Sequence, residues 1–365
     1  MKVTLRWYGS ENDNISLNQI KQIPGVTGVV GTILDIPVGE VWELNRILRL
    51  KKEVESYGLK LEVIESVNVH EDIKLGLTTR DKYIENYKET LKNLSTLGIK
   101  VVCYNFMPVF DWFRTDLSKE LPDGSTVFSY KEEIFEKIDK DNIFKEMLEK
   151  FDGFNMPGWE EERLNKIKGL YTEYKNVNEE KLWENLEYFL KEIIPVAEEL
   201  DTKMAIHPDD PPWSIFGLPR IIKSKKDLER LISLVDSKYN GIVLCSGSLG
   251  ANRDNNIPEL IRYFGKKGRI HFAHVRNIKF HKGRNFDESS HKTEDGSLDM
   301  YEIMKAYYDI GFDGYIRPDH GRMIWGEKTK PGYGLYDRAL GVAYLNGLWG
   351  AINKEGKEKS KCIQI

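Results

Sequence analysis

The sequence is poor in cysteine and contains no long apolar run. Three cysteines occur in 365 residues, Cys103, Cys245 and Cys362, and they lie far apart. Such a sparse, odd-numbered set does not form the disulfide framework of a small secreted domain and is typical of a reducing compartment. Because no run of about 18 apolar residues occurs, we expect no membrane-spanning helix and no membrane partner.

Positive charge is not in excess either. The chain has 54 Lys and Arg against 58 Asp and Glu, a net charge of −4 and a pI of about 6.1. Binding to a phosphate backbone needs concentrated positive charge, so we expect no nucleic-acid partner. The N-terminus enters a strand-like run at Val3 without the apolar core of a signal peptide. We therefore expect a cytoplasmic protein.

The chain does contain a regular alternation of apolar strand-like runs and amphipathic helical segments. The predicted strands are 3–8, 26–34, 61–67, 100–107, 203–208, 241–245, 269–275 and 312–316. Helical spacing of apolar residues lies between them, for example at 41–57 and 80–97. Such alternation predicts an α/β fold with a parallel sheet, and eight units predict a closed (β/α)8 TIM barrel. The active site of this barrel type lies at the carboxyl ends of the strands.

The alternation is interrupted once, after the fourth strand. Residues from about 109 to 178 form a segment too long for a simple loop, with a charged helical pattern at about 131–151. The apolar residues of this segment are too scattered for a core of its own. We therefore interpret residues 1–365 as a single barrel domain with a helical insertion at about 109–178 over the barrel mouth.

Four predicted strands end on side chains that can bind a metal ion. His207 and Cys245 stand at the ends of the fifth and sixth strands, and His274 and Asp319 at the ends of the seventh and eighth. Two imidazoles, a thiolate and a carboxylate suit Mn, Fe, Co, Ni or Zn better than Ca or Mg. A structural role is the alternative for each residue, such as a small buried apolar side chain for Cys245. Their equivalent places in one barrel favour a shared metal site.

His320 directly follows the last of these candidate ligands. If the strand has ended before Asp319, both side chains reach one pocket and His320 is a candidate general acid or base. If it has not, His320 packs between barrel and helix. His281 and His291 lie in a polar loop at 278–296, and we interpret them as solvated residues of a loop whose length suits a lid.

Six short runs resemble the mannonate dehydratase family. They are Arg6-Trp7-Tyr8-Gly9, His207-Pro208-Asp209-Asp210-Pro211-Pro212, Cys245-Ser246-Gly247-Ser248, Phe272-Ala273-His274-Val275-Arg276-Asn277, Arg317-Pro318-Asp319-His320-Gly321 and Pro331-Gly332-Tyr333. The similarity extends from the first strand to the last helix. The second and fifth runs are the most specific, and together they make a chance similarity implausible.

The resemblance implies a xylose-isomerase-like barrel with one divalent ion per chain, Mn²⁺ or Fe²⁺. It also implies a hydro-lyase that removes water from D-mannonate, a small sugar acid, to give 2-dehydro-3-deoxy-D-gluconate in hexuronate breakdown. The metal ligands of the family correspond to His207, Cys245, His274 and Asp319. Its acid and base correspond to His320 and to a tyrosine, which we place at Tyr333, with Tyr336 as the alternative. A tyrosine base would need a lowered pKa, which a nearby cation would provide.

A polyol carboxylate requires polar and cationic groups around the cavity. Our candidates for binding it lie at or near strand ends: Arg6, Trp7, His70, Asn105, Arg276 and Asn277. For the arginines the alternative is an ion pair elsewhere, and for Trp7 it is packing in the barrel.

Two other functions are compatible with this barrel. A metal-dependent sugar isomerase or epimerase usually has a carboxylate-rich site, and the thiol of Cys245 weighs against it. A binding protein without catalysis would not need both His320 and Tyr333. The insertion and an aromatic-rich last helix, at about 336–349, agree with a homo-oligomer, for which we favour a dimer.

Overall fold

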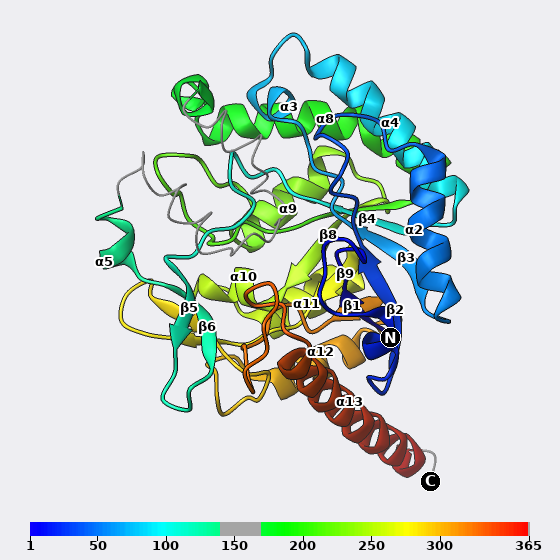
Figure 1. The fold of residues 1–365 in the computed structure, drawn as a ribbon, viewed down its shortest axis with the longest axis vertical. Helices are drawn as coiled ribbons and strands as arrows, with labels where there is room; N and C mark the ends of the chain where they lie inside the picture. The colour runs from blue at the N-terminus through cyan, green and yellow to red at the C-terminus, as the bar shows by residue number, and fades with distance from the viewer. Residues whose placement is uncertain (139–168, 364–365) are drawn as a thin grey trace.

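A closed barrel of eight parallel strands forms the centre of the molecule (Figure 1). The structure is a computed structural model, and it describes residues 1–138 and 169–363. The strand order around the barrel is β1-β12-β9-β8-β7-β4-β3-β2. The strands are β1 (Lys2–Arg6), β2 (Val26–Gly31), β3 (Lys60–Glu65), β4 (Val101–Tyr104), β7 (Lys203–Ile206), β8 (Asn240–Cys245), β9 (Ile270–His274) and β12 (Tyr315–Arg317). The predicted (β/α)8 barrel is confirmed.

Helices surround the barrel on the outside (Figure 1). They are α1 (Leu17–Lys21), α2 (Leu44–Ser56), α3 (Glu71–Leu75), α4 (Arg80–Thr96), α8 (Glu179–Glu199), α9 (Lys225–Leu234), α10 (Ser246–Ala251), α11 (Ile257–Lys266), α12 (Met300–Asp309) and α13 (Leu335–Ile363). Caps set their beginnings: the side chain of Asn256, for example, accepts the N–H of Glu259 at the start of α11. Among the described helices, none combines the length and the apolar content that a membrane crossing requires.

Side chains fill the barrel interior. One buried cluster takes its residues from β2, β3, β4, β7, β8, β9 and β12: Val30, Val63, Val101, Cys103, Ala205, Val243, Phe272 and Tyr315. Small and branched side chains predominate, as in the packed core of other barrels of this type. A barrel packed in this way is not a pore, so the chemistry is confined to the strand ends.

The first and last strands of the barrel pair with each other and close it. Lys2 lies opposite Tyr315, and Val3 opposite Ile316, in a parallel register. The same first strand pairs on its other side with β2, which begins at Val26. Closure therefore pairs the first barrel strand of the sequence with the last one.

A second sheet of four strands, which we call the accessory sheet, is separate from the barrel. Its order is β10-β11-β6-β5. The strands are β5 (Asp116–Glu120), β6 (Thr126–Tyr130), β10 (Ile278–Phe280) and β11 (Phe286–Glu288). The first pair is a hairpin within the insertion, followed by the short helix α5 (Glu132–Phe135), and the second pair lies in the loop after β9. The sequence pattern did not predict this hairpin or its pairing with the later loop.

The insertion shares a core with other loops. Aromatic residues from it, such as Phe113 and Tyr130, form one buried cluster with Trp213, Phe216 and Phe286. The apolar residues that look scattered in the sequence therefore pack against segments more than 70 residues away. Residues 139–151 of the predicted charged helix lie outside the described residues. The interpretation of the chain as a single domain remains a prediction.

Candidate active site

Three metal-binding side chains converge at the carboxyl ends of β7, β8 and β9. One donor atom from each of His207, Cys245 and His274 lies within 4.8 Å of the other two. Strand register is the cause, because Cys245 lies opposite His274 across β8 and β9, and His207 directly follows β7. Parallel strands place their carboxyl ends at one edge, so donors distant in sequence meet there.

Asp319 adds a carboxylate to this group. Its Oδ2 lies 3.5 Å from the Sγ of Cys245, and its Oδ1 lies 3.7 Å from the Nδ1 of His274. The strand β12 has already ended at Arg317, and Asp319 has a left-handed backbone with φ of 60°, a conformation that aspartate tolerates better than most residues. Asp319 and His320 therefore both line one cavity. This arrangement was the condition for considering His320 as a general acid or base.

Two arginines hold the Asp319 carboxylate. Arg317 Nη2 lies 2.8 Å from Oδ1, and Arg276 Nε lies 3.0 Å from Oδ2. Burial raises the pKa of Asp319, but Arg317 and other neighbouring groups lower it well below its usual value. Asp319 is therefore ionised, which is the form that a metal ligand requires.

These four donors fit a divalent transition metal. Two imidazoles, one thiol and one ionised carboxylate make a mixed set that hard ions such as Ca²⁺ do not select. The Nδ1 of His274 is buried and, in the described part of the chain, has no hydrogen-bond partner, while Arg317 Nε lies 3.0 Å from the Nε2 of the same ring. A buried nitrogen without a partner is rare, and a bound ion is one explanation for it.

Tyr333 is the tyrosine that contacts His320. Its Oη lies 2.9 Å from the Nε2 of His320, whereas Tyr336 is 41% exposed and lies against Trp325. Burial and the neighbouring Tyr8 raise the pKa of Tyr333 well above its usual value, although Arg317 opposes them. The lowered pKa expected for a tyrosine base is therefore not found, and Tyr333 keeps its proton.

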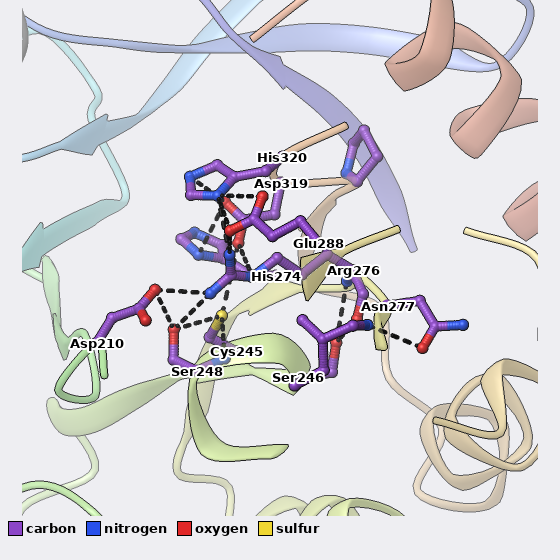
Figure 2. A network of polar contacts seen from close by, with 12 residues as sticks. Asp210, Cys245, Ser246, Ser248, His274, Arg276, Asn277, Glu288, Asp319 and His320 are labelled. Atoms are coloured by element: carbon purple, nitrogen blue, oxygen red, sulfur yellow. Dashed lines mark hydrogen bonds and ion pairs between the residues drawn. The ribbon is translucent and has the colours of Figure 1, made fainter. Parts of the chain in front are cut away.

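The other nitrogen of His320 faces a buried carboxylate (Figure 2). Oε1 and Oε2 of Glu288 lie 2.8 and 2.9 Å from Nδ1. Arg114 donates to Glu288 at 3.0 Å and to the two oxygens of Asp210 at 2.7 and 2.9 Å. Arg276 also pairs with both carboxylates, at 2.6 Å from Asp210. All five side chains are buried, and two of them, Asp210 and His320, border the cavity.

A single cavity connects these groups. Of the residues predicted from the sequence, six line it: Arg6, Asn105, His207, Asp319, His320 and Tyr333. Two of the metal donors, His207 and Asp319, and the proposed proton-transfer pair therefore face the same space.

The metal donors Cys245 and His274 are not part of the cavity wall, and neither are four of the predicted substrate-binding residues. Trp7 donates its indole N–H to a backbone carbonyl within the main core, and His70 caps the start of α3. Asn277 donates to a backbone carbonyl in the loop before α12. Arg276 reaches the site through its contacts with Asp319 and the buried carboxylates. A role of these four residues in substrate binding remains a prediction.

Sequence reasoning did not single out several residues of the site. Tyr8 and Glu65 line the cavity, and both stand at strand ends, the signal that identified the metal donors. Glu288 is different, because it lies in a three-residue strand within a segment that looked like a polar loop. The same misreading affected His291, which is buried with Nε2 2.5 Å from the carbonyl oxygen of Pro318. The expectation that His291 is solvated is wrong.

Comparison with known proteins identifies close relatives. The model of the family described as D-mannonate dehydratase (UxuA) matches residues 1–359. A mannonate dehydratase of Thermotoga petrophila is 64% identical over 357 residues, which cover 98% of this chain and 99% of that protein. A mannonate dehydratase of Geobacillus thermodenitrificans is 57% identical over 371 residues, 100% of both chains.

Solved structures include one similar in both sequence and fold and others similar in fold alone. The crystal structure of mannonate dehydratase from Streptococcus suis serotype 2 matches with a TM-score of 0.89 at 46% identity, over 98% of this chain and 96% of that one. A D-psicose 3-epimerase from Clostridium cellulolyticum H10 matches with a TM-score of 0.53 at 13% identity, over 98% and 99% of the chains. The second likeness shows a common fold and nothing more.

Proposed function

Because this chain belongs to the D-mannonate dehydratase family, we propose that its strand-end cavity is the active site of that reaction. The activity is that of a metal-dependent hydro-lyase, which eliminates water from D-mannonate to give 2-dehydro-3-deoxy-D-gluconate in carbohydrate catabolism. One observation supports the assignment of residues: the His320–Tyr333 pair lines one cavity with His207 and Asp319. The buried donors Cys245 and His274 lie beside those two residues.

The proposed metal ligands are His207, Cys245, His274 and Asp319. The mixed nitrogen, sulfur and oxygen donor set supports Mn²⁺ or Fe²⁺, with one ion per chain. When bound, the ion supplies Lewis-acid polarisation of the oxygen atoms of the sugar acid. Arg317 and Arg276 keep the Asp319 carboxylate ionised and oriented for this role.

His320 and Tyr333 are the proposed proton-transfer pair. Elimination breaks the C2–H and C3–O bonds of the sugar acid and forms a C2=C3 double bond. His320 takes the C2 proton on Nε2. Tyr333 is protonated because burial raises its pKa, and it gives its own phenolic proton to the departing hydroxide, which leaves as water. The 2.9 Å contact then returns the proton from Nε2 to Oη. The enol product tautomerises to the 2-keto acid.

Arg6 and Asn105 are the proposed direct contacts for the carboxylate and hydroxyl groups of the substrate. Both lie on the cavity wall. Arg6 is held in place by the backbone, since its Nη1 donates to the carbonyl oxygen of Gly31 at 2.9 Å. Trp7, His70, Arg276 and Asn277 would then act by fixing the surrounding loops.

We also propose a cytoplasmic homodimer. Cys103 and Cys245 are free thiols, and a thiolate ligand needs the reducing conditions of that compartment. Trp325 is 74% exposed next to Tyr336, and Leu340 is 47% exposed, which supports an apolar contact between two copies. Sedimentation of the wild type and of Trp325→Ser measures this: we expect a dimer that the substitution weakens, and a wild-type monomer contradicts it.

A metal-dependent sugar epimerase is the second candidate, and it is not favoured. Its support is the fold shared with an epimerase at 13% identity. Relatives named mannonate dehydratase reach 64% identity over almost the full length.

Incubation of metal-free and Mn²⁺- or Fe²⁺-loaded protein with D-mannonate tests the proposed function. We expect a 2-keto-3-deoxy acid with the loaded protein alone, measured by its reaction with periodate and thiobarbiturate. D-Psicose serves as the matched epimerase substrate in parallel. Interconversion of psicose without turnover of mannonate would reverse the assignment.

A further inference from the structure

The accessory sheet brings a carboxylate to the back of the proton-transfer pair. Glu288 is the last residue of β11, which pairs with β10 on one side and with β6 of the insertion on the other. Its side chain is 2% exposed and both of its oxygens face the Nδ1 of His320. No residue of the barrel strands occupies this position behind the ring.

We propose that Glu288 is a positioning residue for His320: it accepts the Nδ1–H and so presents an unprotonated Nε2 to the cavity. The role of His320 in catalysis rests on the proposed function, but the contact and the tautomer do not. The hydrogen bond at one imidazole nitrogen decides which nitrogen carries the proton in the neutral ring. It also fixes the plane of the ring.

Competition from Arg276 does not reverse this assignment. Its Nη1 lies 2.8 Å from the same Nδ1, and a guanidinium can only donate. The Nη1 of Arg276, however, also pairs with Oε1 of Glu288. Oε2 of Glu288, at 2.9 Å, therefore remains to accept the Nδ1–H of His320. Oε1 then accepts from Arg276 and Arg114 and Oε2 accepts from His320, so neither Glu288 oxygen is left unsatisfied.

The carboxylate stays charged in spite of its burial. Burial raises the pKa of Glu288, but His320, Arg276 and Arg114 lower it below its usual value. A negative charge at this place stabilises the imidazolium that forms when Nε2 takes a proton, as in other acid–base sites where a carboxylate stands behind a histidine. The insertion contributes directly, because Arg114 links Glu288 to Asp210.

In this tautomer the lone pair of His320 Nε2 points toward the hydroxyl group of Tyr333. At 2.9 Å the Tyr333 hydroxyl donates to Nε2, and this is the starting arrangement that the proposed proton transfer requires. The opposite tautomer would place a proton on Nε2 and leave it unable to act as the base. The accessory sheet thus determines which nitrogen of His320, Nδ1 or Nε2, can act as the base.

The variant Glu288→Gln tests the role in the metal-loaded enzyme. Glutamine keeps the size of the side chain and removes its charge. We expect kcat to fall by about 10²-fold, with KM within about twofold of the wild type and the same metal content. A kcat within about twofold of the wild type would overturn the proposal.

Asp287→Asn is the matched control on the same strand. Its carboxylate pairs with Lys119 and His281 and does not contact His320. We expect a kcat within about twofold of the wild type. An equal loss in both variants would show that any carboxylate of β11 supports the fold, and would also overturn the positioning role.

Nitrogen NMR of the full chain with labelled histidine needs no turnover. The His320 signal is identified by its loss in His320→Asn. We expect a protonated Nδ1 in the metal-free wild type and a shift of the proton toward Nε2 in Glu288→Ala. A wild-type ring protonated on Nε2 alone would disprove the contact, even if Glu288→Gln does not fold. Failure to dehydrate mannonate, by contrast, would refute the proposed function and leave this result intact.

Discussion

The barrel edge and the accessory sheet contribute to the cavity in different ways. The barrel edge presents the donors His207, Cys245 and His274, each placed by the register of its strand. The accessory sheet presents Glu288, which contacts His320, and the insertion adds Arg114, which donates to Glu288. The first region is assembled by parallel pairing at the proposed metal site, and the second by antiparallel pairing of two distant loops.

Under the proposed assignment, this difference separates metal binding from proton transfer. Changes at the barrel edge should remove the ion and with it all turnover. Changes on the side of the accessory sheet should leave the ion bound and reduce kcat alone. His320 lies where the two regions meet, between Asp319 and Glu288.

The largest effect is expected for Cys245→Ala at the barrel edge. Loss of the thiolate removes one donor of four, so we expect metal affinity to fall by more than about 100-fold and turnover to be lost. Elemental analysis after dialysis measures the metal content. Cys103→Ala, a second buried cysteine, is the control and should keep its metal. A full complement of metal in Cys245→Ala would remove this residue from the site.

His320→Asn should separate the two regions most sharply. The variant keeps Asp319 and the other donors, so we expect normal metal content. It loses the proposed base, so we expect kcat to fall by about 10²–10⁴-fold. Steady-state kinetics combined with elemental analysis measure both values. Near-normal turnover would make His320 a structural residue. Loss of metal would show that metal binding and proton transfer do not depend on separate regions.

Tyr333→Phe is expected to reduce kcat by about 10²-fold, because the proton of the buried hydroxyl is lost and the ring remains. Tyr336→Phe is the matched control, since this tyrosine is 41% exposed and points to Trp325. Its kcat should stay the same. The opposite order of the two variants would transfer the assignment to Tyr336.

The smallest effect is expected for Lys119→Ala on the accessory sheet. Lys119 is partly exposed and pairs with Asp287 on the side of β11 that does not contact His320. Loss of such a pair costs about 1 kcal/mol of stability or less. Chemical denaturation measures this change, and kcat should not change. A large fall in kcat would mean that catalysis depends on the rigidity of the whole sheet.

The barrel edge could be predicted from the sequence because its signals are local. Each apolar run ends on a reactive side chain, and the alternation with helices implies that those ends meet. Cys245 and His274 lie opposite each other for this reason alone. The division of tasks between Asp319 and His320 depended on where one strand ends, which the left-handed backbone of Asp319 resolves.

The accessory sheet could not be predicted in the same way. Glu288 belongs to a strand of three residues, whose charges resemble those of a solvated loop. Its pairing with β6 joins segments that lie far apart in the chain, and no local pattern encodes such a partner. One signal was present: Pro122-Asp123-Gly124 is a turn sequence between β5 and β6, and it indicates the hairpin.

Closure of the barrel by β1 and β12 has a consequence for the order of folding. The hydrogen-bonded side chains of Lys2 and Tyr315 are separated by 313 positions, so the ribosome must complete most of the chain before the two strands pair. Such non-local pairing slows folding. Asp319, His320 and Tyr333 all follow β12 in the sequence. A nascent chain therefore acquires the proposed fourth metal donor and the proposed proton-transfer pair last, so under this assignment tight metal binding would require the completed barrel.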